Sequence, residues 1–277
     1  MFLFKKNFRY YFCRIINRIN LFLNFKINSK IQVRVLIIHA TNNENDLIKL
    51  LSHLNKKWSF ITPDQFFEFM ESKQNLQKPS LLITFDDGFK NNLNVIPILK
   101  KFSISALFFV CPGLVELQSS NLLFPLLAKN LFRINSNNKD IELLSWDDLR
   151  FLQKQGHSIG NHSSFHYQMN KLTKDDLFED ITLSKKLLAK NLDYNKSFES
   201  FSYPFGGVNH INLFCLSFLS RNFKYIFSGT RGDNNRRKSK IIFRDAVSLD
   251  DHLEITDSFL MGSIDFYYRF KLIKMGL

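Results

Sequence analysis

Two adjacent carboxylates stand at the end of an apolar run in this sequence. The stretch "LLITFDDG" covers residues 81–88 and contains Asp86 and Asp87. Repulsion and desolvation both disfavour like charges at the end of a buried strand, so a positive partner is expected beside them. If that partner is a metal ion, one carboxylate can bind it while the other accepts a proton. The alternative is that both carboxylates cap a helix that begins after Gly88.

A histidine pair offers further ligands for such a metal. Residues 156–166 read "GHSIGNHSSFH" and place His162 and His166 four residues apart, a spacing that on a helical turn points both imidazoles the same way. With one carboxylate they form a set of three ligands that leaves a position open for water, as catalytic zinc sites require. The same spacing occurs on many surface helices, so the pair alone is a weak signal. His157, at the start of the expected strand, is interpreted as a core residue.

Strands have to bring these residues together, and the sequence contains seven short apolar runs typical of strands. They are Val33–Ile38, Leu81–Phe85, Ser105–Val110, Ser158–Gly160, Ser200–Tyr203, Lys224–Phe227 and Lys240–Phe243. Helix signals lie between most of them. Strands that alternate with helices indicate a parallel sheet, and seven of them favour an α/β barrel over a sandwich.

Three of the expected helices have clear start signals. Thr62 followed by Pro63 supplies a cap and a proline at the first helical position. Ser145 with Asp148 three residues later forms a capping pair, and Thr173 opens a long amphipathic run. These helices are expected to cover the sheet and to fix the order of its strands.

In parallel barrels, the residues that do chemistry lie at the carboxyl ends of the strands, because the loops there converge on one face. The residues expected at these ends are His39, Asp86, Asp87, Asn161, His162, Tyr203, Pro204, Phe205, Gly206, Ser228, Arg244 and Asp245. Carboxylates, histidines and an arginine are therefore predicted to meet at one end of the barrel.

Three motifs resemble those of the polysaccharide deacetylases, the carbohydrate esterase family four with a NodB homology domain. TFDDG at 84–88, HSSFH at 162–166 and YPFG at 203–206 follow the family's order, and the similarity covers roughly residues 31–250. The resemblance implies a deformed (β/α)7 barrel and one divalent metal ion, usually zinc. It also implies removal of the acetyl group from an N-acetylated sugar.

The resemblance also assigns roles to individual residues. By position in the motifs, Asp87, His162 and His166 would be the metal ligands and Asp86 the general base. Phe205 follows the proline of the third motif, so its backbone N–H would bind the developing oxyanion.

Two features of the family are missing from their usual places. The late Leu-x-His motif that supplies the general acid has no match near the C-terminus, and His39 is the candidate acid, as in the circularly permuted exported-glycan deacetylases. The arginine that often precedes the third motif is also missing, and Arg244 is the candidate to hold Asp86. The alternative for Arg244 is a structural ion pair with Asp245 or another carboxylate.

The N-terminal residues 1–30 differ from the rest of the chain in charge. They contain seven of the basic residues behind the net charge of +13 and no acidic residue. Apolar residues recur there at steps of three and four, which predicts an amphipathic helix. An anionic membrane surface is one expected partner, and packing on its own domain or on a second subunit is the equal alternative.

The expected location follows from the same segment. Arginines at positions 9, 14 and 18 interrupt every apolar run, and no small-residue cleavage site follows. We therefore expect the cytoplasm or the inner face of the cell membrane. The domain division expected is a segment 1–30 followed by a catalytic domain 31–277.

Other function classes fit the sequence less well. No zinc-finger, KH or RNP pattern is present, so no nucleic acid is expected as a partner, and residues 231–240 are interpreted as a solvated basic loop. Three cysteines without a CxxC pair indicate neither a disulfide framework nor a thiolate metal site. A glycan-binding barrel with impaired catalysis, or a hydrolase of O-acetyl esters or other amides, are the alternatives. The apolar segment Asn121–Phe132 is expected to pack in the core or to form a lid.

Overall fold

The computed structural model describes residues 32–118, 120, 123–132, 142–235 and 241–274. The helix expected over residues 1–30 lies outside these ranges, and so does the domain boundary after residue 30. The same holds for residues 121–122 of the apolar segment and for residues 236–240 of the basic loop.

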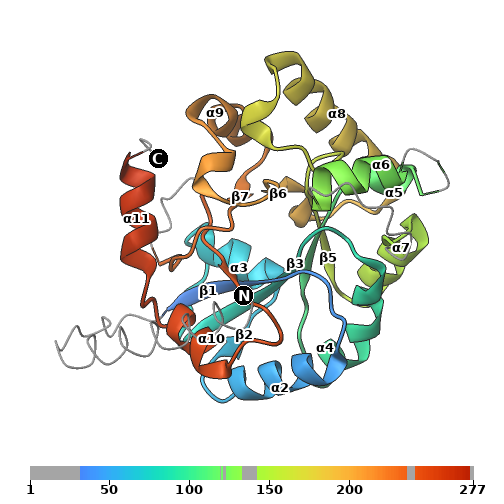
Figure 1. Ribbon diagram of the computed structural model, residues 1–277. Coiled ribbons are helices and arrows are strands. Elements are labelled where there is room, and N and C mark those ends of the chain that lie inside the picture. The colour runs from blue at the N-terminus through green and yellow to red at the C-terminus, as the bar shows by residue number, and fades with distance from the viewer. Residues whose placement is uncertain (1–31, 119, 121–122, 133–141, 236–240, 275–277) are drawn as a thin grey trace, which may run out of the picture.

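One curled, all-parallel sheet forms the centre of the molecule (Figure 1). Its strands follow the order β7-β6-β5-β4-β3-β1-β8, and β2 pairs with the first residues of β3. Their bounds are β1 Val33–Ile38, β2 Ser59–Phe60, β3 Ser80–Phe85, β4 Leu107–Val110, β5 Ser158–Asn161, β6 Ser200–Ser202, β7 Tyr225–Phe227 and β8 Asp245–Ala246. Six strands lie where the apolar runs predicted them, within a few residues, whereas the short β2 was not predicted.

The seventh predicted strand, Lys240–Phe243, is wrong in position. Ile242 forms a single parallel bridge to Phe227 of β7, while Asp245 and Ala246 pair with β1 as β8. This stretch therefore touches both ends of the curled sheet and pairs with each over only one or two residues. The apolar pattern indicated a regular strand, but a stretch shared between two neighbours cannot form a long ladder with either.

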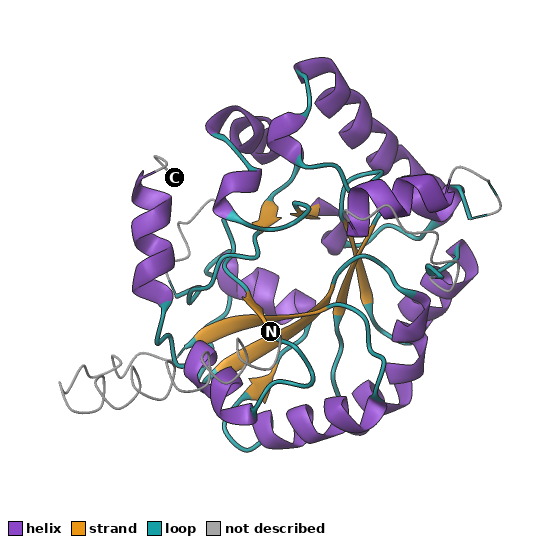
Figure 2. Cartoon of the chain, viewed as in Figure 1, coloured by secondary structure: helices purple, strands orange, loops and turns teal. Residues whose placement is uncertain are grey.

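Helices surround the sheet (Figure 2). Their bounds are α2 Glu44–Leu54, α3 Pro63–Met70, α4 Ile96–Lys101, α5 Pro112–Glu116, α6 Leu123–Leu126, α7 Trp146–Lys154, α8 Lys174–Asn191, α9 Leu213–Asn222, α10 Leu253–Leu260 and α11 Asp265–Lys274. The three predicted helix starts are confirmed: Thr62 and Ser145 each form a capping box, and the Thr173 side chain accepts from the N–H of Asp176. No helix within the described ranges combines the length and the apolarity needed to cross a bilayer.

The two faces of each strand pack into different apolar clusters. In β3, Leu81, Ile83 and Phe85 contact the layer formed with α2 and α4, whereas Leu82 packs in a second cluster with Phe66 of α3. Burial on both faces is typical of strands in a parallel α/β sheet, and it explains why these runs are apolar without alternation.

The same alternation directs the predicted site residues toward the inside of the curled sheet. Side chains change face at every residue of a strand, so Leu82, Thr84 and Asp86 follow one another on the same face. In the same way, Gly160 of β5 lies against Phe109, which belongs to the same cluster as Leu82 and Phe66, and His162 follows two residues later. Asp86 and His162 thus each continue an inward-facing row of side chains beyond the end of their strand.

Candidate metal centre

Asp86 lies just beyond β3 and pairs with an arginine. The Nη1 and Nη2 groups of Arg244 donate to Oδ1 and Oδ2 of Asp86, each at 2.8 Å. Arg244 also donates to Ser202 Oγ at 2.6 Å and to the Ser228 carbonyl at 2.7 Å. Both partners are almost completely buried. The positive partner expected beside Asp86 is therefore a side chain of the protein itself, the Arg244 guanidinium.

Asp245, the alternative partner of Arg244, is bound elsewhere. Its carboxylate accepts from Arg34 Nε at 2.8 Å and lies 3.3 Å from Arg231 Nη1. Arg34 donates in turn to Asp265, the first residue of α11, at 2.7 Å. This buried ion cluster joins β1, β8 and α11, so two neighbouring residues, Arg244 and Asp245, serve different networks.

The surroundings of Asp86 keep it ionised. Burial alone would raise the pKa of this carboxyl, but the charges of Arg244, His162 and His39 together outweigh burial and hold the pKa below its ordinary value. A buried carboxylate in a bidentate arginine pair is thus a negative group at neutral pH that can accept a proton.

Asp87 faces both predicted histidines. Its Oδ1 lies 3.3 Å from His162 Nε2 and 3.3 Å from His166 Nε2, and the three ligand atoms all lie within 4.8 Å of one another. All three residues are buried. Asp87 has a φ of +74°, a left-handed conformation that turns it away from the row of Asp86. Two adjacent carboxylates therefore serve two separate partners.

The other ring nitrogen of each histidine binds a backbone carbonyl. His162 Nδ1 lies 2.6 Å from the carbonyl oxygen of Ser202, and His166 Nδ1 lies 3.0 Å from that of Asn130. A carbonyl oxygen only accepts, so Nδ1 carries the proton in both rings. This leaves both Nε2 lone pairs directed at the point that Asp87 faces, which is the arrangement that orients histidine ligands in metal sites.

The spacing of the histidines suggested a helical turn, but they do not lie on one. His162 follows β5 directly, and the loop after it contains left-handed residues at Ser163 (φ +67°) and His166 (φ +58°). The loop is held by Asp180 of α8, whose two carboxylate oxygens each accept from the Ser164 N–H at 3.1 Å. The convergence of the rings therefore comes from an irregular loop.

The electrostatics of the three side chains suit a cation. Burial would raise the pKa of Asp87, but its contacts with His162 and His166 hold the pKa well below the ordinary value. Burial would lower the pKa of His162, but its contact with Asp87, the charge of Asp86 and the Ser202 carbonyl outweigh burial and raise the pKa. One carboxylate oxygen and two imidazole nitrogens are ligands that zinc accepts, so the residues fit a divalent ion, which would displace any proton from the two Nε2 atoms.

Neither expected cap role is found for the two aspartates. The turn Lys90–Val95 and helix α4 follow them, and Phe89, the residue before that turn, forms no side-chain cap.

His157 lies in the core as expected: its Nδ1 accepts from the Ala106 N–H at 3.2 Å, and burial lowers its pKa to about 4.

The third motif forms a tight turn beside this cluster. Phe205 is left-handed (φ +64°), and its ring contacts that of His166 with a centroid distance of 4.6 Å. Gly206 is also left-handed (φ +58°), and a Cβ there would lie 2.4 Å from the backbone nitrogen of Gly229. Only glycine fits at position 206, because both its backbone conformation and the neighbouring chain exclude a side chain.

His39 follows β1 and has an exposed side chain. Its charge contributes to the lowering of the pKa of both Asp86 and Asp87, so it lies within electrostatic range of both carboxylates. His39 and Phe205 follow strands β1 and β6, as expected for residues at carboxyl ends. Arg244 instead directly precedes β8, so its predicted place at the end of a strand is wrong, although its side chain does reach Asp86.

Comparison with known proteins assigns the family. The sequence profile described as "Polysaccharide deacetylase" matches residues 73–217, which is more than half of the chain and includes both aspartates and both histidines. The chain belongs to the polysaccharide deacetylase family.

Relatives and solved structures agree with the family. The chain is 27% identical over 210 residues to the poly-beta-1,6-N-acetyl-D-glucosamine N-deacetylase of Staphylococcus aureus strain MRSA252. The match covers 72% of the chain and 64% of that relative, so the chain spans less than two thirds of the curated relatives that it matches first.

The fold is that of deacetylases of known structure. The structure of IcaB from Ammonifex degensii has a TM-score of 0.65 at 20% identity and covers 84% of this chain and 98% of its own. The Streptococcus pyogenes deacetylase PplD has a TM-score of 0.65 at 19% identity, with 84% and 99% covered. The expected deformed (β/α)7-type barrel is confirmed by these likenesses.

Sequence reasoning missed three residues of this candidate site. Ser202 and Asn130 hold the histidines through backbone carbonyls, and Asp180 holds the loop between them. A carbonyl is present at every residue, so no sequence signal marks the first two. Asp180 could have been found from the sequence, since it is an acidic residue on the apolar face of the predicted helix after Thr173.

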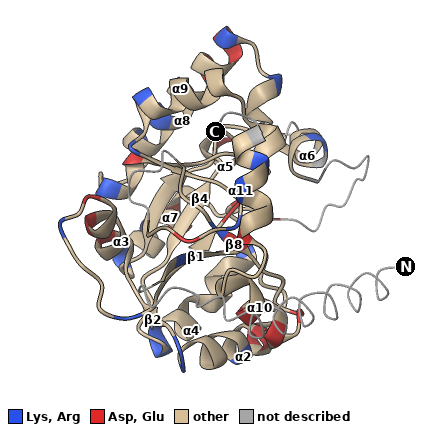
Figure 3. Ribbon diagram, turned by 90° about the vertical axis from the view of Figure 1, so that its left-hand side faces the viewer, with Lys and Arg blue, Asp and Glu red and all other residues tan. Residues whose placement is uncertain are grey.

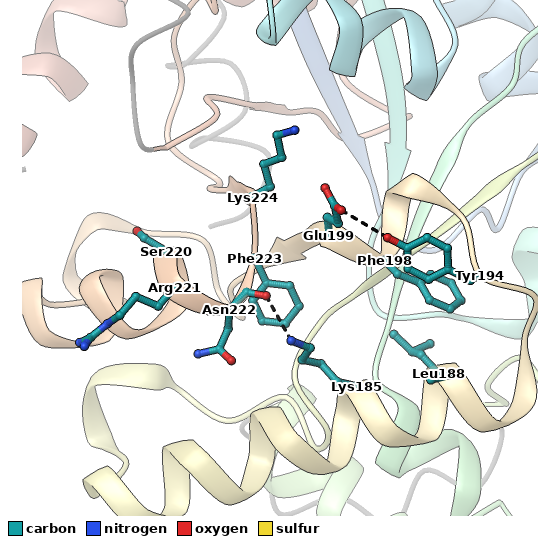
Figure 4. Close-up of a pocket in the computed structure, with 11 residues that line it drawn as sticks. Lys185, Leu188, Tyr194, Phe198, Glu199, Ser220, Arg221, Asn222, Phe223 and Lys224 are labelled. Atoms are coloured by element: carbon teal, nitrogen blue, oxygen red, sulfur yellow. Dashed lines mark hydrogen bonds between the residues drawn. The ribbon is translucent and has the colours of Figure 1, made fainter.

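A separate groove has a volume of about 630 Å³, and Figure 4 shows the residues that line it. Residues of α8, the end of α9 and the amino ends of β6 and β7 line it, among them Lys185, Tyr194, Glu199 and Lys224. It contains no predicted site residue. Since the aspartates and histidines lie at the carboxyl ends of the strands, the groove is at the other end of the sheet.

Proposed function

We propose that the protein is a metal-dependent deacetylase that hydrolyses the N-acetyl group of an N-acetylhexosamine in a glycan. The observation that carries the proposal is the convergence of Asp87, His162 and His166 on one point, beside a separate carboxylate, Asp86, that has its own arginine. The substrate class is supported by the poly-N-acetylglucosamine deacetylase among the relatives. A surface glycan or a lipid-linked precursor of one is the proposed form of the substrate.

The chain's residues divide the reaction between them. A divalent ion in the site, zinc being the expected one, would polarise the acetyl carbonyl and lower the pKa of water. Asp86 then accepts a proton from the attacking water, since it is ionised and buried next to the ligand set. Arg244 holds Asp86 in position through two hydrogen bonds, so that the carboxylate keeps one orientation during proton transfer.

The remaining steps use the third motif and the first strand. The backbone N–H of Phe205 donates to the carbonyl oxygen as negative charge develops on it. His39 donates a proton to the nitrogen as the C–N bond breaks, which releases acetate and leaves a free amine on the sugar. The left-handed turn at Phe205, fixed by Gly206, and the position of His39 after β1 support these roles.

Loss of a ligand tests the proposal directly. Asp87→Asn and His162→Ala are expected to lose bound metal and deacetylation together, by more than the roughly 10–100-fold that removal of an outer partner of a metal ligand causes. Metal content of the purified protein and mass change of N-acetylated glucosamine oligomers are the measurements.

A surface pair supplies the matched controls for these variants. His53 Nε2 lies 3.0 Å from Asp257 Oδ1 on a partly exposed surface, so His53→Ala and Asp257→Asn repeat the chemistry of the changes elsewhere. Both controls should retain metal and activity. An Asp87→Asn variant that stays active with a full complement of metal would refute the ligand set, and release of O-acetyl groups alone would refute the amide substrate.

We also propose that the protein associates peripherally with an anionic membrane surface. The seven basic residues of segment 1–30 support this, and so do the exposed apolar side chains of Phe266, Phe270 and Ile273 on α11. Basic residues share α11 with them (Figure 3). Full-length protein should sediment with phosphatidylglycerol vesicles but not with phosphatidylcholine vesicles. Equal sedimentation after Lys5, Lys6 and Arg9 are changed to Glu would count against a role for the segment.

A further inference from the structure

The two histidines of the centre are held by different parts of the molecule. His162 binds the carbonyl of Ser202, which belongs to strand β6. His166 binds the carbonyl of Asn130, which lies in the connection between β4 and β5. No family motif contains Asn130, and the proposed mechanism does not use it.

Asn130 makes two bonds to two consecutive residues of the histidine loop. Its backbone oxygen accepts from His166 Nδ1 at 3.0 Å, and its side-chain Nδ2 donates to the Phe165 carbonyl at 2.9 Å. The residue is 7% exposed. Its side chain thus fixes the loop backbone immediately before the ring that its own carbonyl orients, so the two bonds act on the same short stretch.

The turn that carries Asn130 has an unusual backbone. Residues Leu127–Phe132 form a π-helical turn that directly continues α6. Such turns are rare and occur frequently at functional sites. Here the Asn130 carbonyl is used for a side chain of the metal centre.

Apolar packing fixes the position of this turn. Leu123 and Leu127 are buried in a cluster with Cys111, Leu114 and Leu143, and Phe165 packs against the same cluster. Of the alternatives for the apolar segment 121–132, core packing is therefore confirmed for its described buried residues. The cluster lies outside the strands of the sheet, so it adds a second support for the site.

We infer that Asn130 is a positioning residue of the metal centre, which holds His166 in the orientation and tautomer that metal binding requires. The inference rests on the metal-binding part of the proposed function. The orientation of His162 is fixed by strand β6 and that of His166 by this turn. The turn therefore determines how well the ring of His166 is preorganised for metal binding. Loss of its clamp should weaken metal binding without removal of any ligand.

Two substitutions test the clamp. Asn130→Ala removes the bond to Phe165, and Asn130→Leu removes it while keeping the shape of the side chain. Each should weaken zinc and cobalt binding to the full chain by about 10–100-fold, measured by titration calorimetry and by the visible spectrum of bound cobalt. The thermal midpoint of the metal-free protein should change far less.

Asn170 provides a matched control. Its Nδ2 also donates to a backbone carbonyl, that of Asn209, at 2.9 Å, but it has no bond to the histidine loop. Asn170→Ala should leave metal affinity unchanged. If the wild type binds metal and both Asn130 variants bind it within twofold of wild type, the inference is wrong while the proposed function stands. If the wild type binds no metal, the proposed function itself fails.

A measurement on the unaltered protein covers the case in which the variants do not fold. Coupling between two sites is reciprocal, so zinc must stabilise the turn if the turn supports zinc. Amide hydrogen exchange in residues 127–132 should slow on addition of zinc, together with exchange in 162–166. Protection of 162–166 alone would overturn the inference.

Discussion

The two halves of the candidate metal centre are built in different ways. One half consists of Asp86 and His162, which follow strands β3 and β5, and of Arg244, which directly precedes β8. Buried side-chain and strand contacts fix these three residues. The other half consists of Asp87 and His166, which are left-handed, and is held by side chains from α8 and from the turn at 127–132. The first half inherits its geometry from the sheet, whereas the second needs its own supports.

The difference shows where the site stores strain. Left-handed conformations of residues other than glycine cost about 1–3 kcal/mol each and persist only where the surroundings hold them. Asp87, Ser163 and His166 all have this conformation. The loop half is therefore the half in which a lost hydrogen bond should release the ligands, while the strand half should respond with loss of global stability.

The largest expected effect of a single substitution near these two halves is on turnover. His39→Gln should lower kcat by about 10²–10⁴-fold, because the proton for the leaving amine would have to come from water. Metal content should not change, since His39 is not a ligand in the proposed set. Activity assays with metal analysis of the same preparation are the check, and unchanged kcat would reassign the general acid.

Removal of Arg244 should affect folding. Arg244→Met leaves Asp86 buried without its partner, and breaking a buried pair in this way costs about 3–5 kcal/mol of unfolding free energy. Urea unfolding gives the value. Lys90→Met is the control, because Lys90 pairs with Asp148 at a position where its side chain is 38% exposed, and such pairs contribute about 0–1 kcal/mol. Equal losses for both variants would contradict a structural role of the buried pair in the strand half.

The loop half should show a pH dependence through Asp180. Burial raises the pKa of Asp180 to about 6, above its ordinary value of 3.8. The unfolded chain therefore loses this proton first as the pH rises, and wild-type stability falls between about pH 4 and pH 6 by roughly 3 kcal/mol.

Asp180→Asn removes this titration. Relative to wild type, the variant should gain about 3 kcal/mol of unfolding free energy between pH 4 and pH 7, as followed by urea unfolding at several pH values. Parallel pH profiles for the two proteins would show that the carboxyl is not responsible.

The smallest effect sharpens the contrast with Asn130. Ser202→Ala removes the hydroxyl between Asp86 and Arg244 but keeps the carbonyl that holds His162. Stability should fall by about 1–2 kcal/mol, the usual range for a lost buried hydrogen bond. Metal affinity should stay within twofold of wild type, unlike that of Asn130→Ala. A large loss of affinity would mean that both halves depend equally on side-chain bonds.

Local signals in the sequence were sufficient for most elements. The caps at Thr62, Ser145 and Thr173 start helices because side-chain oxygens satisfy nearby N–H groups, whatever the rest of the chain does. Apolar runs marked six strands, and the residue types at their ends pointed to Asp86, Asp87 and the histidine pair. These inferences depend only on neighbours in the chain.

The residues that complete the site were decided by tertiary structure. Arg244 reaches Asp86 across 158 residues, and Asn130 reaches His166 across 36, and neither contact leaves a mark near either residue in the sequence. The misplaced seventh strand has the same origin, because the partners of residues 242–246 are the two ends of a curled sheet. The sequence by itself determined which side chains can do the chemistry. Which groups hold them, and in what orientation, depended on the path of the folded chain, because backbone carbonyls and long-range ion pairs become specific only when distant segments meet.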